Sequence, residues 1–238
     1  MQRHILKLWL FVGLVGLVGT ARADDPGIEL QNYTFRPAGN AKFSIGWTFQ
    51  LSHPITITAL GTMDFGGNSI ATDGPMPVAL YYSSATAPNV GTTSDGFHTS
   101  GTPVAGASVI VTATDPIMAP NGGPYVSGDG FRYHMLDTPI TLYSDPQVPT
   151  LPKPGYEIQA ANMGSGYATN WASVTNDGVI GPIAATYSMN TPSTPDYETN
   201  VFTSFGQAFA GPNFLIQTPE PTAIALVAVG TVALIRRR

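Results

Sequence analysis

The clearest strand pattern in the chain is Phe43-Ser44-Ile45-Gly46-Trp47-Thr48-Phe49-Gln50-Leu51. Large apolar side chains occupy every second position, from Phe43 through Trp47 to Leu51, and small or polar residues lie between them. Because successive side chains of a strand point to opposite faces, this alternation predicts a β-strand with one buried face. The chain around this stretch repeats the same kind of pattern.

Short runs rich in β-branched and aromatic residues follow one another along the chain, separated by turn clusters such as 65–68, 121–124 and 176–178. No amphipathic helical stretch of ten or more residues interrupts them. About eleven short strands with frequent turns predict an all-β fold, an antiparallel β-sandwich of jelly-roll or immunoglobulin-like type. The other expected strands are 28–30 continuing to 33–35, 55–60, 78–82, 108–112, 131–135, 140–143, 156–160, 183–189, 202–209 and 214–216.

Two segments share a Pro-Ile-Thr core, His53-Pro54-Ile55-Thr56-Ile57 and Thr138-Pro139-Ile140-Thr141-Leu142. Each follows an aromatic stretch, 47–49 in one case and 131–133 in the other. We therefore expect two equivalent strand pairs within one sandwich. A tandem repeat of fixed period is not visible.

The N-terminus has the features of a secretory signal peptide. Arg3 and Lys7 precede an apolar run, Leu8 to Val18, and Ala21-Arg22-Ala23 has the small-x-small pattern of a cleavage site. We expect signal peptidase to cut after Ala23, using Ala21 and Ala23, and to leave Asp24 as the mature N-terminus. Retention of the run as a membrane anchor is the alternative, which the short run and the cleavage site disfavour.

The C-terminus consists of three parts: Pro219-Glu220-Pro221, an apolar run over 222–235, and Arg236-Arg237-Arg238. As a helix the 14-residue run would be about 21 Å long, shorter than the roughly 30 Å core of a bilayer. Bilayer thinning would allow transient insertion, with the arginines on the cytoplasmic side. A buried C-terminal helix is the alternative, and the lack of a polar face disfavours it.

These three parts, in this order, resemble the PEP-CTERM sorting signal of exported bacterial proteins. The resemblance covers about 20 residues and implies processing at Pro219, Glu220 and Pro221 by an exosortase, a membrane-embedded protease. It also implies a place at the cell surface or in an extracellular matrix, associated with exopolysaccharide or biofilm. The expected organisation is a signal peptide over 1–23, a sandwich over 24–217 and a sorting segment over 218–238, with a signal helix and a short apolar helix flanking the sandwich.

The body is also similar to a group of uncharacterised β-sandwich domains of exported bacterial proteins. The similarity is carried by Gly46-Trp47-Thr48-Phe49 through 55–61, Val78-Ala79-Leu80-Tyr81, Gly130-Phe131-Arg132-Tyr133 and Gly155-Tyr156-Glu157-Ile158. It implies the fold and no activity.

The charge of the expected body excludes one class of partner. It contains four basic residues, because six of the chain's ten fall in the two termini, and 14 of the 15 acidic residues. Four minus 14 gives a net charge of −10. Nucleic-acid binding requires clustered Lys and Arg, so we expect no nucleic-acid partner.

The chain has no cysteine, which excludes disulfides, thiol nucleophiles and cysteine metal sites.

One loop combines hard oxygen ligands with glycines, as Ca²⁺ sites do. Asp64, Asn68 and Asp73 lie on the Gly-rich connection between two expected strands, although the spacing is not that of an EF-hand. Ser127-Gly128-Asp129-Gly130 is a weaker candidate of the same kind. An ordinary turn is the alternative, since Asn, Asp and Gly favour turns, and we expect no other cofactor.

Aromatic residues offer a second kind of site. Tyr82 and Trp171, together with Tyr81, Tyr125 and Tyr167, are candidate platforms for stacking on sugars, and ordinary packing is the alternative. His53, His98 and His134 have no metal-ligand spacing, and the chain has no G-x-S-x-G motif. The leading hypothesis is a non-enzymatic exported surface or matrix protein. A carbohydrate-binding module with a structural Ca²⁺ is the alternative, and a polysaccharide hydrolase is a third.

Overall fold

The computed structural model describes residues 24–37, 43–84, 103–144, 154–163, 166–176, 178–188, 200–202 and 211–217. Residues Asp25–Ile216 form one compact unit. The predicted signal helix and the apolar helix near the C-terminus lie outside the described residues. Within the described part, no helix has the length and apolar character needed to cross a membrane.

Two large antiparallel sheets and a two-stranded ribbon make up the unit. The five-stranded sheet has the order β1 (Asp25–Pro26), β13 (Pro212–Ile216), β4 (Ile55–Asp64), β8 (Gly130–Leu142), β7 (Ile117–Met118). The six-stranded sheet has the order β12 (Asn200–Phe202), β11 (Val179–Ser188), β3 (Phe43–Leu51), β9 (Pro154–Met163), β5 (Met76–Ser84), β6 (Pro103–Val111). The ribbon pairs β2 (Ile28–Pro37) with β10 (Gly166–Thr175), and the short helices are η1 (Phe65–Gly67) and α2 (Ser69–Asp73).

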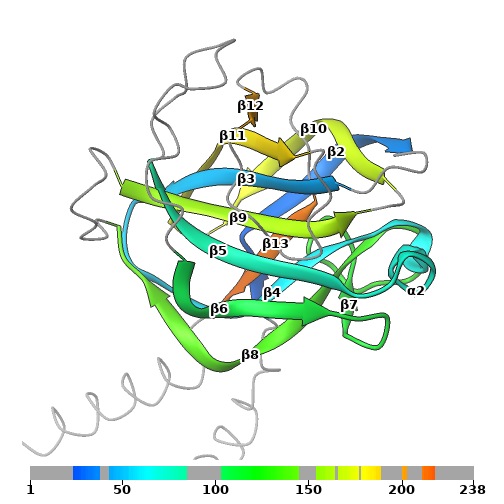
Figure 1. The fold of residues 1–238 in the computed structure, drawn as a ribbon, viewed down its shortest axis with the longest axis horizontal. Helices are drawn as coiled ribbons and strands as arrows, with labels where there is room; N and C mark the ends of the chain where they lie inside the picture. The colour runs from blue at the N-terminus through cyan, green and yellow to red at the C-terminus, as the bar shows by residue number, and fades with distance from the viewer. Residues whose placement is uncertain are drawn as a thin grey trace, which may run out of the picture. The chain divides into compact units, whose positions relative to one another are not determined.

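Figure 1 shows the six-stranded sheet in front of the five-stranded one, with β13 passing behind β9 and β5. The predicted all-β antiparallel sandwich is confirmed. Strands predicted near 43–51, 55–60, 78–82, 156–160 and 214–216 all form, each within one or a few residues of the expected bounds.

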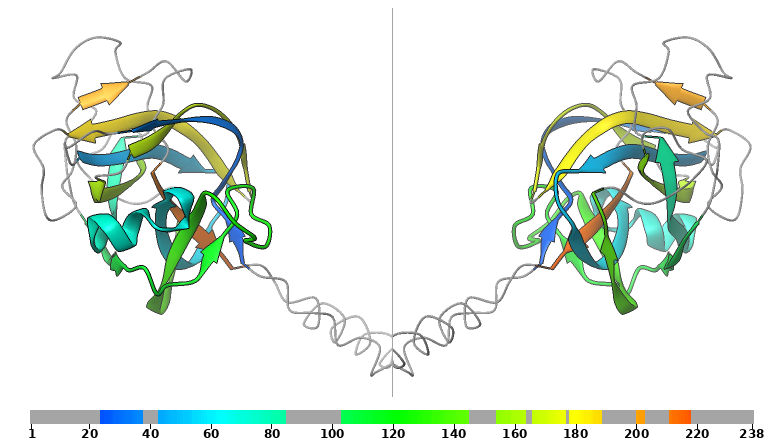
Figure 2. Two further views of the ribbon diagram at one scale, coloured as in Figure 1. Left: turned by 90° about the vertical axis from the view of Figure 1, so that its right-hand side faces the viewer. Right: turned by 90° about the vertical axis from the view of Figure 1, so that its left-hand side faces the viewer.

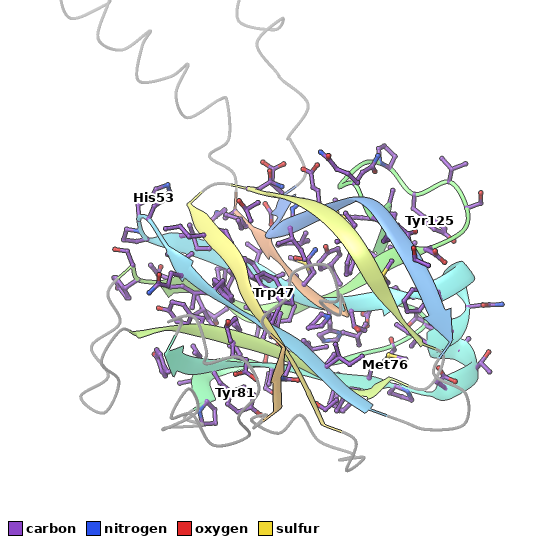
Figure 3. All side chains as sticks on the ribbon, turned by 90° about the horizontal axis from the view of Figure 1, so that it is seen from above. Trp47, His53, Met76, Tyr81 and Tyr125 are labelled. Atoms are coloured by element: carbon purple, nitrogen blue, oxygen red, sulfur yellow. The ribbon has the colours of Figure 1, made fainter. Side chains whose placement is uncertain are left out.

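An aromatic core joins the two sheets. The alternation in β3 buries Trp47 and Phe49 completely, and both rings pack on Phe214 of β13, at centroid distances of 5.7 and 5.0 Å. The indole N–H of Trp47 donates to the carbonyl oxygen of Pro212, 2.8 Å away. This bond satisfies the polar atom that burial of a tryptophan would otherwise leave without a partner. Figure 3 shows Trp47 in the middle of the body.

The first and last strands of the unit are partners. Asp25 pairs with Ile216 and Pro26 with Leu215, while β13 lies between β1 and β4 in the sheet. Residues 25–28 and 212–216 are called the end junction below. The two ends of the compact unit therefore lie side by side at one edge of the sandwich.

One buried amide side chain and one close backbone contact fix the end junction. The amide of Asn213 is fully buried, accepts from the N–H of Ile28 at 3.2 Å and donates to its carbonyl oxygen at 2.8 Å. The backbone N–H of Gly27 donates to the carbonyl oxygen of Phe214 at 2.8 Å. A Cβ at Gly27 would overlap the ring of Phe214, so this close approach requires glycine.

One long strand replaces two that were predicted. The runs 131–135 and 140–143 belong to β8, in which residues 136–139 lie opposite Thr58 of β4 alone. This bulge explains the turn-like Asp137-Thr138-Pro139 within a strand. The outer neighbour β7 pairs only with Phe131 and Arg132, so the missing N–H of Pro139 removes no ladder bond on that side.

The two Pro-Ile-Thr segments are direct partners. Ile55 pairs with Leu142, Thr56 with Thr141 and Ile57 with Ile140. The expectation of two equivalent strand pairs is therefore wrong. The first segment begins β4, which lies in the other sheet from its aromatic stretch in β3. The second segment belongs to β8, the same strand as its aromatic stretch. The shared sequence reflects two strands that face each other in one ladder.

Candidate functional site

The two Gly-rich loops singled out in the sequence meet at one end of the sandwich, where α2 and β7 are labelled in Figure 1. The N–H of Gly66 donates to Asp129 Oδ1 at 2.7 Å. The hydroxyl of Tyr125 donates to the carbonyl oxygen of Gly128 at 2.9 Å, and a Cβ at Gly67 would overlap that hydroxyl. Gly67 also has a φ of +70°, which favours glycine. The two loops are therefore packed against each other and joined by a hydrogen bond.

Asp64 stands at the end of β4 and is completely buried. Its Oδ1 accepts from the hydroxyl of Ser69 at 2.9 Å and from the N–H of Ile70 at 3.1 Å. Its Oδ2 forms an ion pair with Arg132 Nε. The carboxylate thus holds the turn from β4 into α2 and neutralises Arg132. Without these donors, burial of the charge would be costly.

Arg132 connects three segments through its planar guanidinium. Besides Asp64, it donates to the carbonyl oxygen of Asp115 at 2.8 Å and to that of Gly67 at 3.1 Å. Only 14% of its side chain is exposed. A guanidinium has five donors in a fixed fork, and this geometry suits a residue that must bond β4, η1 and the loop before β7 together.

Asp115 extends the network to the surface. Its Oδ2 accepts from the N–H and the hydroxyl of Thr112 at 2.7 and 3.1 Å. Its Oδ1 lies 3.0 Å from Nδ1 of His134, whose side chain is 45% exposed. Asp64, Asp115, Asp129, Arg132 and His134 are called the acidic clamp below. His134 is half exposed and has a carboxylate partner.

Asp129 completes the clamp by binding the ribbon. The hydroxyl of Tyr33 on β2 donates to Asp129 Oδ2 at 2.8 Å. Burial, and then the hydrogen bond to this carboxylate, raise the pKa of Tyr33 well above its ordinary value. Tyr33 therefore remains a neutral donor at any physiological pH.

The carboxylates of the clamp are not arranged as a cation site. Among the residues that the structure describes, no group of three or more His, Asp or Glu side chains is placed to hold a metal ion. Asp64 already accepts from three protein donors. Asn68 lies exposed between η1 and α2, and Asp73 ends α2. The Ca²⁺ site on Asp64, Asn68 and Asp73 stays a prediction, and the observed role of Asp64 is that of a turn-forming residue.

The predicted aromatic platforms have different surroundings. Tyr82 is partly buried, and its ring packs on Tyr156 at a centroid distance of 5.7 Å. Tyr81 is buried. Trp171 lies on β10, where the register with β2 shifts; its side chain is outside the described residues. A sugar-stacking role for Tyr82 and Trp171 stays a prediction, and Tyr82 packs as a residue at the margin of the core.

The six-stranded sheet contains a row of polar residues whose burial the sequence did not predict. Glu157 and Gln159 alternate with the core residues of β9, and both are fully buried. Gln159 Nε2 donates to Glu157 Oε1 at 2.6 Å, and the hydroxyl of Ser44 donates to Gln159 Oε1 at 3.2 Å. Strand alternation places this row on the face opposite Trp47 and Phe49. Alternation within β9 puts Glu157 and Gln159 on one face, and the register of β3 with β9 adds Ser44 to the row.

The predicted processing residues lie beyond the described residues. These are Ala21 and Ala23 at the N-terminus, and Pro219, Glu220, Pro221, Arg236, Arg237 and Arg238 at the C-terminus. The compact unit ends at Ile216, three positions before Pro219.

No family model, curated protein or solved structure matches this chain.

Proposed function

We propose that the chain is an exported, non-enzymatic protein of the cell surface or extracellular matrix. Signal peptidase removes residues 1–23, and an exosortase-type membrane protease acts on the PEP-CTERM tail after it has transiently entered the membrane. The sandwich is the functional unit that remains, in association with extracellular polysaccharide.

The observation that carries the proposal is the position of the body's ends. The compact unit runs from Asp25 to Ile216, and both predicted cutting sites fall just outside it. A cut after Ala23 leaves one residue before β1, and a cut near Pro219 leaves all of β13 in place. Neither cut removes a strand, so the sandwich is able to persist after both.

The arrangement of the buried carboxylates among the described residues supports a non-enzymatic role. Among the described residues, the two fully buried carboxylates are Asp64 and Glu157. They belong to different sheets, and each is bound to its own neighbours. Glycoside hydrolysis requires two carboxyl groups flanking one bond. The acidic clamp uses its carboxylates to hold loops, as a binding or structural protein would.

Intact-mass spectrometry of the protein recovered from its host, after cell fractionation, tests the proposal. We expect a mass that begins at Asp24 and ends near Pro219, outside the cytoplasm. A mass that retains Thr222–Arg238 in the membrane fraction would show a permanent anchor and contradict the proposal.

A matched pair of variants sharpens this test. Alanine at Pro219, Glu220 and Pro221 should preserve the tail and shift the protein to the membrane fraction. Alanine at Pro146 and Pro149, two prolines within the body, should leave the mature mass as in the wild type apart from the substitutions. Equal processing of both variants would show that the Pro-Glu-Pro motif is not recognised.

A further inference from the structure

The last strand of the body is fixed up to the point where the tail begins. Ile216 is 1% exposed and pairs with Asp25 on one side and Ile57 on the other. All five residues of β13 are buried. Gln217 is exposed, so the change from core to surface takes place within one residue.

This leaves a very short connection to the predicted cutting site. Gln217 and Thr218 are the only residues between Ile216 and Pro219. Fully extended chain spans at most about 3.5 Å per residue, so Pro219 lies within roughly 11 Å of Ile216. An enzyme that acts at Pro219 therefore works directly beside the end junction.

Proteins that bind extended peptides commonly do so through main-chain hydrogen bonds to several consecutive residues. An enzyme that needed more than two residues before Pro219 would have to take Ile216 and Leu215 out of β13. Both are buried in the sheet and both are already paired with β4 and β1. In the folded body these two residues are therefore not accessible to such an enzyme.

We propose that the tail-processing enzyme acts on the already folded body, that it reads nothing before Gln217, and that the two-residue spacer sets the closest approach between enzyme and body. This inference rests on the proposed function, since it presumes that the tail is cut. The part of the body nearest to the cutting site is the end of β13 at Ile216, with its partner Asp25 of β1.

Spacer variants of the full chain in its host provide the test. Processing is followed over time with an antibody against the body, and the product is identified by intact mass. Deletion of Gln217 and Thr218 should slow cutting by roughly 10²-fold, because small misplacements of a scissile bond have effects of that size. Insertion of Gly-Ser-Gly-Ser after Gln217 should leave cutting as fast as in the wild type or faster.

A length-matched variant separates spacer length from side-chain recognition. Substitution of both Gln217→Ala and Thr218→Ala should be cut at the wild-type rate, since only the length is constrained. Near-UV circular dichroism of the purified bodies should show that all three variants fold, because Gln217 lies outside the core.

The outcomes distinguish the two proposals. Cutting of the deletion variant at the wild-type rate would overturn the spacer inference and leave the proposed function intact, as would loss of cutting in the Ala-Ala variant. If the wild-type tail is never cut, the proposed function itself fails. Slow cutting of the deletion variant, with normal cutting of the other two, would support the inference.

Discussion

The end junction and the acidic clamp hold distant parts of the chain together by different physics. The junction joins residues 185 positions apart through a strand ladder, buried apolar side chains and one amide. The clamp joins β4 to β8 across 68 positions through carboxylates and a guanidinium. Figure 2 shows the sandwich from two opposite sides. We conclude that packing fixes the ends of the body, whereas charge fixes its loops.

The largest effect should come from removing one half of the junction. A chain that ends at Gly211 lacks β13, which lies between β1 and β4 in the five-stranded sheet and supplies Phe214 to the aromatic core. We expect it not to fold, whereas a chain that ends at Gln217 should fold normally. Near-UV circular dichroism and protease resistance report the difference, and native signals from the shorter chain would contradict the role of β13.

Breaking the clamp at its centre should have the next largest effect. Arg132→Met leaves the carboxylate of Asp64 buried without its cation, which typically costs about 3–5 kcal/mol of unfolding free energy. Urea unfolding measures the loss. Adding Asp64→Asn should recover part of it, because the uncompensated charge is removed. Asp137→Asn, on an exposed residue of the same strand, is the control and should change little.

Asn213→Ala tests the polar part of the junction. It leaves the N–H and carbonyl groups of Ile28 without their buried partner, and each lost partner costs about 1–3 kcal/mol. We expect a loss of roughly 2–4 kcal/mol in urea unfolding, with little dependence on salt. A strongly salt-dependent loss would show that charge contributes to the junction and would weaken the contrast with the clamp.

Alkaline pH should destabilise the body through its tyrosines. Burial raises the pKa of Tyr156 to about 12, although its bond to Tyr143 opposes the shift. Burial also raises the pKa values of Tyr33 and Tyr133. Their stabilising contribution is fully present below pH 10, the unfolded value, and is lost as pH rises towards the folded pKa values. Ultraviolet titration should show these phenols ionising above pH 11 or only on unfolding, and normal titration near pH 10 would contradict their burial.

The smallest effect is expected at the surface of the clamp. His134→Ala removes a half-exposed partner of Asp115, which retains its bonds to Thr112. Interactions at partly exposed sites contribute about 0–1 kcal/mol, so thermal unfolding should shift by only a few degrees. A loss comparable to that of Arg132→Met would place the charge balance of the clamp at His134 instead.

Local patterns in the sequence were sufficient for strands with a clear periodicity. The apolar alternation from Phe43 to Leu51 specified β3 and the side chains that it places in the core. The prediction of a single buried face is wrong, because Ser44 and Thr48 on the other face are also fully buried. Strand β10 was missed because Gly166–Thr175 is mostly small and polar residues without alternation. Its pairing with β2 comes from the tertiary fold, which regularly overrides intrinsic β propensity.

The candidate sites depended on contacts between distant residues, and local patterns therefore missed their organisation. Asp64 and Asp129 were read as parts of two separate loops, but the N–H of Gly66 joins the loops directly. Arg132 gave no local indication that it would neutralise Asp64. Alternation along β9 indicates that Glu157 and Gln159 share a face, but not that this face is buried. The termini are the opposite case, since short linear motifs suffice to predict their processing.

Hydrogen exchange of the purified body, residues 24–217, tests most directly whether the two ends form one cooperative unit. Peptides covering 25–30 and 212–216 should exchange together and as slowly as the aromatic core of β3, because the same opening exposes both strands. Loop residues 119–128 should exchange faster. Rapid exchange of 212–216 while β3 stays protected would show that β13 opens on its own, and would contradict the fixed end of the body.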